Sequence, residues 1–146
     1  MADIFTALSI ASSGMQAQRI RVNTVASNLA NASTTRTEEG GPYRRLDPVF
    51  RAVPVEESFE ATLEGMIDEQ SNKVEVVEVS RDPAPPRKVY DPQHPDADAE
   101  GYVLLPNINV PEEMVNMITA SRSYAACANV FETIKQMARG AVDLLK

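Results

Sequence analysis

The positions of the prolines constrain the fold of this chain more than any other feature. All 10 lie between Pro42 and Pro111 of the 146 residues, and both flanks have none. Proline removes a backbone donor and clashes with the preceding helical turn, so only the flanks can form long uninterrupted helices. We therefore expect an α+β fold: long N- and C-terminal helices that form an antiparallel coiled-coil pair, with a small irregular β-rich central segment.

The N-terminal flank repeats apolar residues at helical spacing. Steps of four and three residues continue for about four heptads, which is the pattern of a coiled-coil seam. Gln18 is its one clear polar interruption. The seam consists of Ile4, Leu8, Ala11, Met15, Gln18, Val22, Val25, Leu29 and Ala32.

The C-terminal flank has a favourable helix start, because Pro111 is followed by two glutamates that suit the first turn. Gly140 weakens the last turns of this helix. The apolar pattern slips once along its length. The expected seam is Met114, Met117, Ser121, Tyr124, Ala128 and Phe131, continued after the slip by Ile134, Ala138, Ala141 and Leu145.

Small residues surround both stripes, as in "TALSIASSGM" and "ITASRSYAACANV". A two-helix hairpin core would explain the stripes alone. Small side chains on several faces also allow close approach of further helices, and a lone pair of helices buries little surface. Packing within the chain and packing between chains therefore both remain open at this point.

The middle of the chain has the composition of short strands. The segments "YRRLDPVFRAV", "KVEVVEV", "RKVY" and "GYVLL" are rich in β-branched and aromatic residues. Residues 59–67 fit a short helix. We expect a coiled-coil domain formed by residues 1–33 and 112–146, and a linker elbow plus β-rich outer segment over residues 34–111.

The net charge of −7 is concentrated in the middle, where residues 42–111 hold 7 Lys and Arg against 14 Asp and Glu. An acidic chain repels a phosphate backbone, so we expect no nucleic-acid partner. No apolar run is long enough to span a membrane. The N-terminus lacks a basic leader, so we expect no cleaved signal peptide.

Catalytic chemistry has little support in this sequence. His94, the only histidine, has no nucleophile or orienting group in a recognisable motif. The acidic stretch "DADAEG" lacks the bidentate glutamate of an EF-hand, since its twelfth position is Asn107. Cys127, the only cysteine, fits a small packed residue. We expect no enzyme activity, cofactor, metal site or small-molecule substrate.

The segment "NASTTRTEEGGPYRR" is the expected elbow. Its two glycines lack the lysine and hydroxyl residue of a phosphate-binding loop. Arg44 and Arg45 are expected to begin a strand and to pair with acids such as Glu38 and Glu39.

Both flanks resemble the terminal signatures of the flagellar axial proteins, the subunits of rod and hook. The N-terminal resemblance is carried by "ALSIASSGMQAQRIRVNTVASNLANASTTRT" and the C-terminal one by "VNMITASRSYAACANVFETIKQMA". Within that family, "TTRTEEGGPYRR" and "YDPQHPDADAEGYVLLPNINVPEEMVNMITASR" are similar to the proximal-rod members.

The resemblance implies a structural subunit of the basal-body rod. Such subunits cross the inner membrane through the flagellar type III export apparatus without signal cleavage and polymerise helically in the periplasm. The assembly transmits torque to the hook and forms the export channel. The implied partners are copies of the chain, the rod proteins FlgB, FlgF and FlgG, FliE and the MS ring.

The resemblance also implies subunit interfaces along both helices and the elbow. A cytoplasmic helical-hairpin adaptor or export chaperone is the alternative, and a hydrolase acting on cell-wall glycan is a third class without an identifiable acid pair. The expected interface positions are the seam residues given above from Ile4 to Leu29 and from Met114 to Ile134, with Leu145, Asn23, Asn28, Asn31, Thr35, Arg36, Tyr43, Arg44, Arg45 and Arg122.

Overall fold

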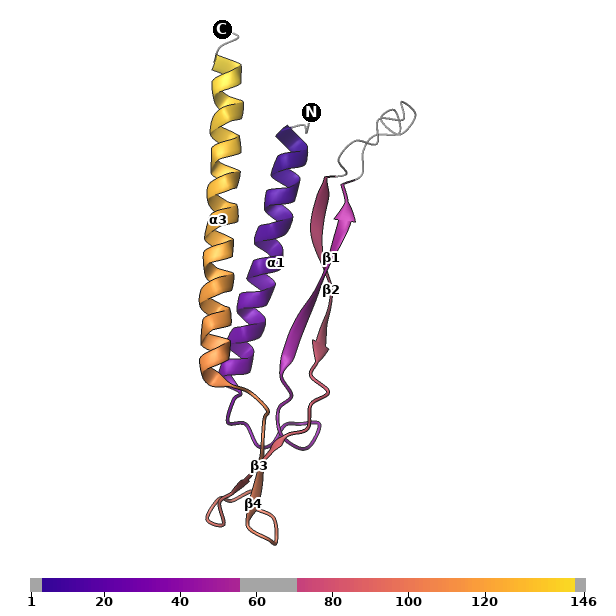
Figure 1. The fold of residues 1–146 in the computed structure, drawn as a ribbon, viewed down its shortest axis with the longest axis vertical. Coiled ribbons are helices and arrows are strands. Elements are labelled where there is room, and N and C mark those ends of the chain that lie inside the picture. The colour runs from indigo at the N-terminus through magenta and orange to yellow at the C-terminus, as the bar shows by residue number, and fades with distance from the viewer. Residues whose placement is uncertain (1–3, 56–70, 144–146) are drawn as a thin grey trace. The chain divides into compact units, whose positions relative to one another are not determined.

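A computed structural model describes residues 4–55 and 71–143 of the chain. The short helix expected over residues 59–67 and the seam residue Leu145 lie outside these residues. Two long helices carry the proline-free flanks: α1 spans Ile4–Ala30 and α3 spans Val110–Asp143. Both are shown in Figure 1. The placement of the expected helices at the two flanks is therefore confirmed.

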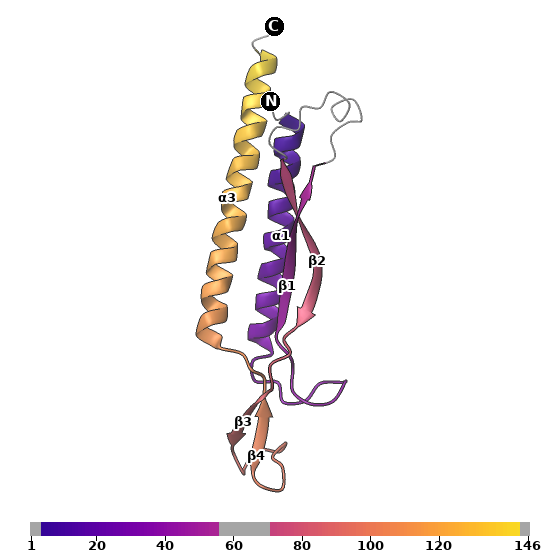
Figure 2. The same cartoon turned by 45° about the vertical axis from the view of Figure 1, so that its right-hand side comes forward.

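The central segment is structured, so the expectation of an irregular β-rich region was wrong. Strand β1 (Leu46–Pro54) pairs with β2 (Asn72–Arg81), and β3 (Arg87–Tyr90) pairs with β4 (Tyr102–Leu105). The members of each pair run in opposite directions (Figure 1 and Figure 2). Local composition located the strands, but pairing depends on partners that are distant in sequence, for example Arg87 with Leu105, and composition does not show these partners.

The chain divides into two compact units. The first contains Met1–Arg19, Phe50–Val77 and Ser121–Lys146. In it, Ser13 of α1 uses its hydroxyl oxygen to accept a hydrogen bond from the Val74 amide of β2 at 3.2 Å. A Cβ atom on Gly14 would lie 3.1 Å from Cys127 Sγ, so α1 and α3 approach closely there.

The second unit contains Ile20–Val49 and Glu78–Ala120. It holds most of the buried side chains, including Val25, Val103 and Ile108. Within it, α1 contacts the start of α3 through hydrogen bonds: Arg21 to Asn116, and Asn28 to Glu113. The later residue of α1, Asn28, bonds the earlier residue of α3, Glu113, so the two helices are antiparallel in this unit.

Candidate functional site

The end of α1 is fixed by the side chain of Asn31. Its Nδ2 donates to the Ser27 carbonyl oxygen at 2.9 Å, and its Oδ1 accepts from Thr34 Oγ1 at 3.2 Å. Asparagine and threonine side chains compete in this way with the helical pattern of the backbone. The chain therefore leaves the helix after Ala30 and enters the elbow.

Asn28 uses all its hydrogen-bonding capacity inside the second unit. Its Nδ2 donates to the Leu46 carbonyl at 2.8 Å and to Glu113 Oε2 at 3.1 Å. Its Oδ1 accepts from the Leu46 amide at 2.9 Å and from the Tyr43 hydroxyl at 3.2 Å. The side-chain amide thus pairs with both peptide groups of Leu46, as a neighbouring strand would. Because Asn28 is fully buried, these bonds fix where β1 starts relative to α1.

Glu113 completes this site from the first turns of α3. It is 1% exposed, and its Oε1 accepts a hydrogen bond from Arg45 Nε at 2.8 Å. Burial alone would lower the pKa of Arg45, but the hydrogen bond and charge of Glu113, helped by Asp47, outweigh it and raise that pKa. A buried carboxylate needs such a partner. We call Asn28, Tyr43, Arg45, Leu46 and Glu113 the elbow cluster.

A second ion pair holds the loop that precedes β1. The guanidinium of Arg81, the last residue of β2, donates to both carboxylate oxygens of Glu39, at 2.9 Å to Oε1. The hydrogen bond from Arg81, followed by its charge, lowers the pKa of Glu39. The expected pairing of Arg45 with Glu38 or Glu39 was therefore wrong. Arg45 instead bonds Glu113 and Asp47, because it faces the start of α3.

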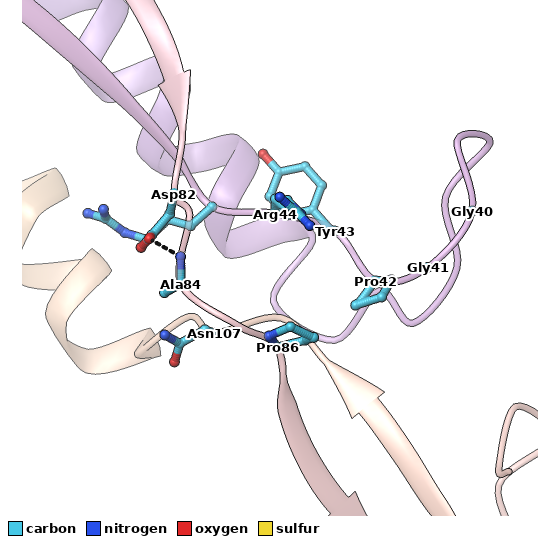
Figure 3. A pocket seen from close by; sticks show the side chains of 10 residues that line it. Gly40, Gly41, Pro42, Tyr43, Arg44, Asp82, Ala84, Pro86 and Asn107 are labelled. Carbon is cyan, nitrogen blue, oxygen red and sulfur yellow. Dashed lines mark hydrogen bonds between the residues drawn. The ribbon is translucent and has the colours of Figure 1, made fainter.

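A hollow lies beside the elbow cluster in the second unit (Figure 3). Two of its polar side chains are engaged within the subunit: Arg45 bonds Glu113, and Asp82 Oδ1 accepts from the Ala84 amide at 2.8 Å. It contains no histidine, cysteine or serine. The lining residues are Gly40, Gly41, Pro42, Tyr43, Arg44, Arg45, Asp82, Ala84, Pro86 and Asn107.

The other residues weighed for chemistry lie apart from this site. His94 Nδ1 accepts a hydrogen bond from the Asp96 amide at 3.1 Å, inside the turn between β3 and β4. Across residues 4–55 and 71–143, no group of three His, Cys, Asp or Glu side chains could hold a metal ion. Within the same residues, neither helix is apolar enough over a sufficient length to cross a membrane.

The structure distributes the expected α1 interface positions over different environments. Asn28 is enclosed by the subunit, and Gln18 Oε1 is buried without a hydrogen-bond partner among the described residues. The buried seam positions are Ala11 and Val25; the half-buried ones are Leu8, Met15, Gln18, Val22 and Leu29; Ile4 and Asn23 are exposed.

The expected positions in the elbow and α3 are also divided. Met114 and Tyr124 are 52% and 41% exposed, although they were expected on the seam. Half-buried positions are Asn31, Thr35, Tyr43, Arg45, Met117, Ala128, Phe131 and Ile134; exposed ones are Arg36, Arg44, Ser121 and Arg122.

Sequence analysis did not identify three of the α3 residues that lie on the side facing α1. The covered side of α3 includes Glu113, Ala120 and Cys127, two of them small and one charged. A search for large apolar residues passes over all three. Met117, Phe131, Ile134 and Ala138, which were already on the expected seam, continue the same spacing of four and three residues, and Tyr124 is the one exposed position in the series.

Comparisons with known proteins agree with this architecture. Residues 8–36 match the family "Flagella basal body rod protein", and residues 99–144 match "Flagellar basal body rod FlgEFG protein C-terminal". Three similar relatives are flagellar basal-body rod proteins FlgC. That of Aquifex aeolicus is 47% identical over 94% of this chain and 93% of its own length. That of Borreliella burgdorferi is 39% identical over 98% of both chains.

The third relative, from Bacillus subtilis, is 36% identical over 97% of this chain and 98% of its own. The similarity extends over the helices, the elbow and the central strands alike. The chain therefore belongs to the FlgC family of flagellar basal-body rod proteins and is a structural subunit of the flagellar rod.

Proposed function

We propose that the chain polymerises helically in the rod through its two terminal helices. Residues 1–33 and 112–146 form the coiled-coil domain of the inner tube, and residues 34–111 form the linker elbow and the outer segment. A helical polymer requires heterologous contacts, in which one patch of a subunit meets a different patch of the next. Each helix therefore needs an outward face suited to contact.

The observation that carries this proposal is the outward surface of α3. From Met114 to Phe131 it has no acidic residue and one charge, Arg122. Val115 and Ile118 are 63% and 53% exposed on this stretch. Exposed apolar side chains on a nearly uncharged helix are typical of contact surfaces. Helix α1 has the same two properties, since Ile4–Ala30 contains no acidic residue and the apolar Phe5 is 77% exposed.

The proposed neighbours are copies of this chain, the rod proteins FlgB, FlgF and FlgG, FliE and the MS ring. The rod would transmit torque to the hook and enclose the export channel in the periplasm. The subunit would arrive through the flagellar type III export apparatus without signal cleavage. These points are supported by membership of the rod family and by the exposed helical surface, and they require no catalytic step.

The proposed interface consists of the expected positions that a neighbour can reach. Asn23, Ser121, Arg122 and Tyr124 are exposed on the two helices. Asn28, Tyr43 and Arg45 would contribute indirectly, because their bonds within the subunit fix the elbow from which the outer segment extends.

A substitution at Ile118 tests the proposal. A host lacking its own rod protein of this family would receive the full chain, or Ile118→Asp, or Ile118→Leu as the matched control. We expect the unchanged chain and Ile118→Leu in purified basal bodies and restored swimming, and Ile118→Asp in neither. A buried charge at an apolar contact costs several kcal/mol, whereas an isosteric apolar exchange costs little.

Thermal unfolding of the purified subunits provides the second readout. Ile118 is exposed in the subunit, so both variants should unfold like the unchanged chain. Normal incorporation of Ile118→Asp would contradict the contact at this face. A subunit that is retained in the cytoplasm and never reaches the basal body would favour the adaptor or chaperone alternative.

A further inference from the structure

The two faces of the β3–β4 pair differ in exposure. Its antiparallel register places Val89 opposite Val103 and Tyr90 opposite Tyr102. Directly opposed residues share a face, and alternate residues point to opposite faces. Val103 is only 2% exposed, whereas Val89 opposite it is 39% exposed, so this face is covered at β4 alone. The face that carries the two tyrosines is open.

The open face presents a pre-arranged aromatic pair. The rings of Tyr90 and Tyr102 meet edge to face, with centroids 5.3 Å apart. Tyr90 is 64% exposed, yet its ring is held from one side, because a Cβ on Gly101 would lie 3.0 Å from Tyr90 Cε2. Gly101 has a φ of +82°, which glycine adopts without strain. A large side chain is thus both exposed and fixed, which lowers the entropy lost on docking.

Opposite charges lie at the two ends of this face. Lys88 pairs with Leu104 in the register and shares the tyrosine face at the base of the hairpin. Four exposed acids, Asp91, Asp96, Asp98 and Glu100, lie in the turn. Among the described residues, none of the four acids and neither Lys88 nor Arg87 belongs to an ion pair.

We propose that this face is a contact between copies of the chain: the acidic turn of one copy docks against the Lys88 end of the next, and the tyrosine pair is covered between them. The occupant follows from charge complementarity, because each copy carries a Lys88 end and an acidic turn that form no ion pair among the described residues. Within the turn, Asp91, Asp96 and Asp98 accept hydrogen bonds from the same subunit, whereas Glu100 accepts none among those residues. Such a head-to-tail contact repeats without closing, as a helical polymer needs. The inference rests on the proposed polymerisation and names the surface of the outer segment that takes part.

Disulfide crosslinking tests the contact in the assembled rod. The full chain would carry Lys88→Cys and Glu100→Cys, with Cys127→Ala to remove the native thiol. Four residues of strand separate the two positions along one hairpin, roughly 13 Å, which is too far for a disulfide within one copy. We expect covalent dimers and longer ladders in basal bodies isolated under mild oxidation, and monomers from either single-cysteine variant.

Charge reversal provides an independent readout. Two like charges that meet at a contact repel each other and lower the association constant of that contact about tenfold. Lys88→Glu and Glu100→Lys should each lower incorporation into basal bodies by about that factor, and the double reversal should restore most of it. Glu78→Lys, the same change on the exposed surface of β2, is the matched control and should have no effect.

The two proposals fail in different ways. If the chain is present in basal bodies but the double-cysteine variant yields only monomers, the docking of the acidic turn is wrong and polymerisation stands. The docking would also be wrong if the double charge reversal lowered incorporation by the product of the two single effects, because restored charge pairing should raise it. If the unchanged chain is absent from basal bodies altogether, the proposed polymerisation itself fails.

Discussion

Asn28 Nδ2 and Glu113 Oε2 lie 3.1 Å apart, joining α1 to α3 across 85 residues of sequence. Both side chains are at most 1% exposed. The same two residues bind the start of β1, Asn28 through the Leu46 peptide and Glu113 through Arg45. The elbow is therefore a junction of three elements, held by polar groups of which Asn28 and Glu113 are almost completely excluded from water.

The first prediction concerns Asn28→Ala. The substitution leaves buried polar groups of Leu46 and Glu113 without partners, and each unpaired group costs about 1–3 kcal/mol. We expect a loss of about 3 kcal/mol in the free energy of unfolding, measured with urea. Asn23→Ala, on the exposed side of the same helix, should change it by less than about 0.5 kcal/mol. Equal effects of the two variants would refute the role given to Asn28.

The second prediction concerns the buried ion pair. Arg45→Ala leaves the Glu113 carboxylate buried and uncompensated, which costs about 3 kcal/mol in comparable pairs. Asp47 also contacts Arg45 but is 61% exposed, so Asp47→Ala should cost less than about 1 kcal/mol. The measurement is again urea unfolding. A larger loss of unfolding free energy in Asp47→Ala than in Arg45→Ala would contradict this, because it would assign the stabilisation to Asp47 and not to the buried pair of Arg45 with Glu113.

Two helical glycines should respond differently to alanine. Nothing lies within 4 Å of a Cβ built on Gly140, so Gly140→Ala should stabilise α3 by up to about 1 kcal/mol. At Gly14 the new methyl would meet Cys127 Sγ at 3.1 Å. Gly14→Ala should therefore stabilise the protein less than Gly140→Ala does. In a protein that also carries Cys127→Ala, the stability change caused by Gly14→Ala should be more favourable. Helicity and thermal unfolding of the single and double variants measure this coupling, and its absence would contradict the close approach of the two helices.

The ion pair between Glu39 and Arg81 predicts a pH dependence. The pKa of Glu39 is lowered by the hydrogen bond from Arg81 and then by its charge. The pair is therefore intact above the ordinary glutamate pKa and is lost as the pH falls through the lowered value. Carboxyl NMR titration should show the pKa of Glu39 rising toward its usual range in Arg81→Gln. An unchanged pKa in that variant would show that Arg81 is not the cause.

Much of the fold could be predicted from local sequence. The absence of proline predicts both helices, and β-branched segments predict the positions of the strands. The pairing of the strands could not be predicted, since it depends on residues distant in sequence. The sequence located the elbow but did not predict its contacts. In the sequence, the buried Glu113 cannot be distinguished from an ordinary acidic residue in the first turn of a helix.

The exposure of the expected interface positions within the subunit could be predicted only in part, for a related physical reason. The expected seam did not distinguish residues that face α1 from residues that face outward: Met114 and Tyr124 are exposed, whereas the small Ala120 is fully buried. Where the two helices approach most closely, small residues such as Ala120 and Cys127 occupy the contact between them. A periodic pattern alone does not distinguish the two faces.

The central claim is that neighbouring subunits cover the outward face of α3 in the rod. A cryo-electron microscopy map of basal bodies built with this chain tests it most directly. We predict that Val115, Ile118 and Tyr124, all exposed in the single subunit, are buried against helices of adjacent subunits. A map in which these side chains face solvent, with subunits joined only through the central strands, would contradict the account.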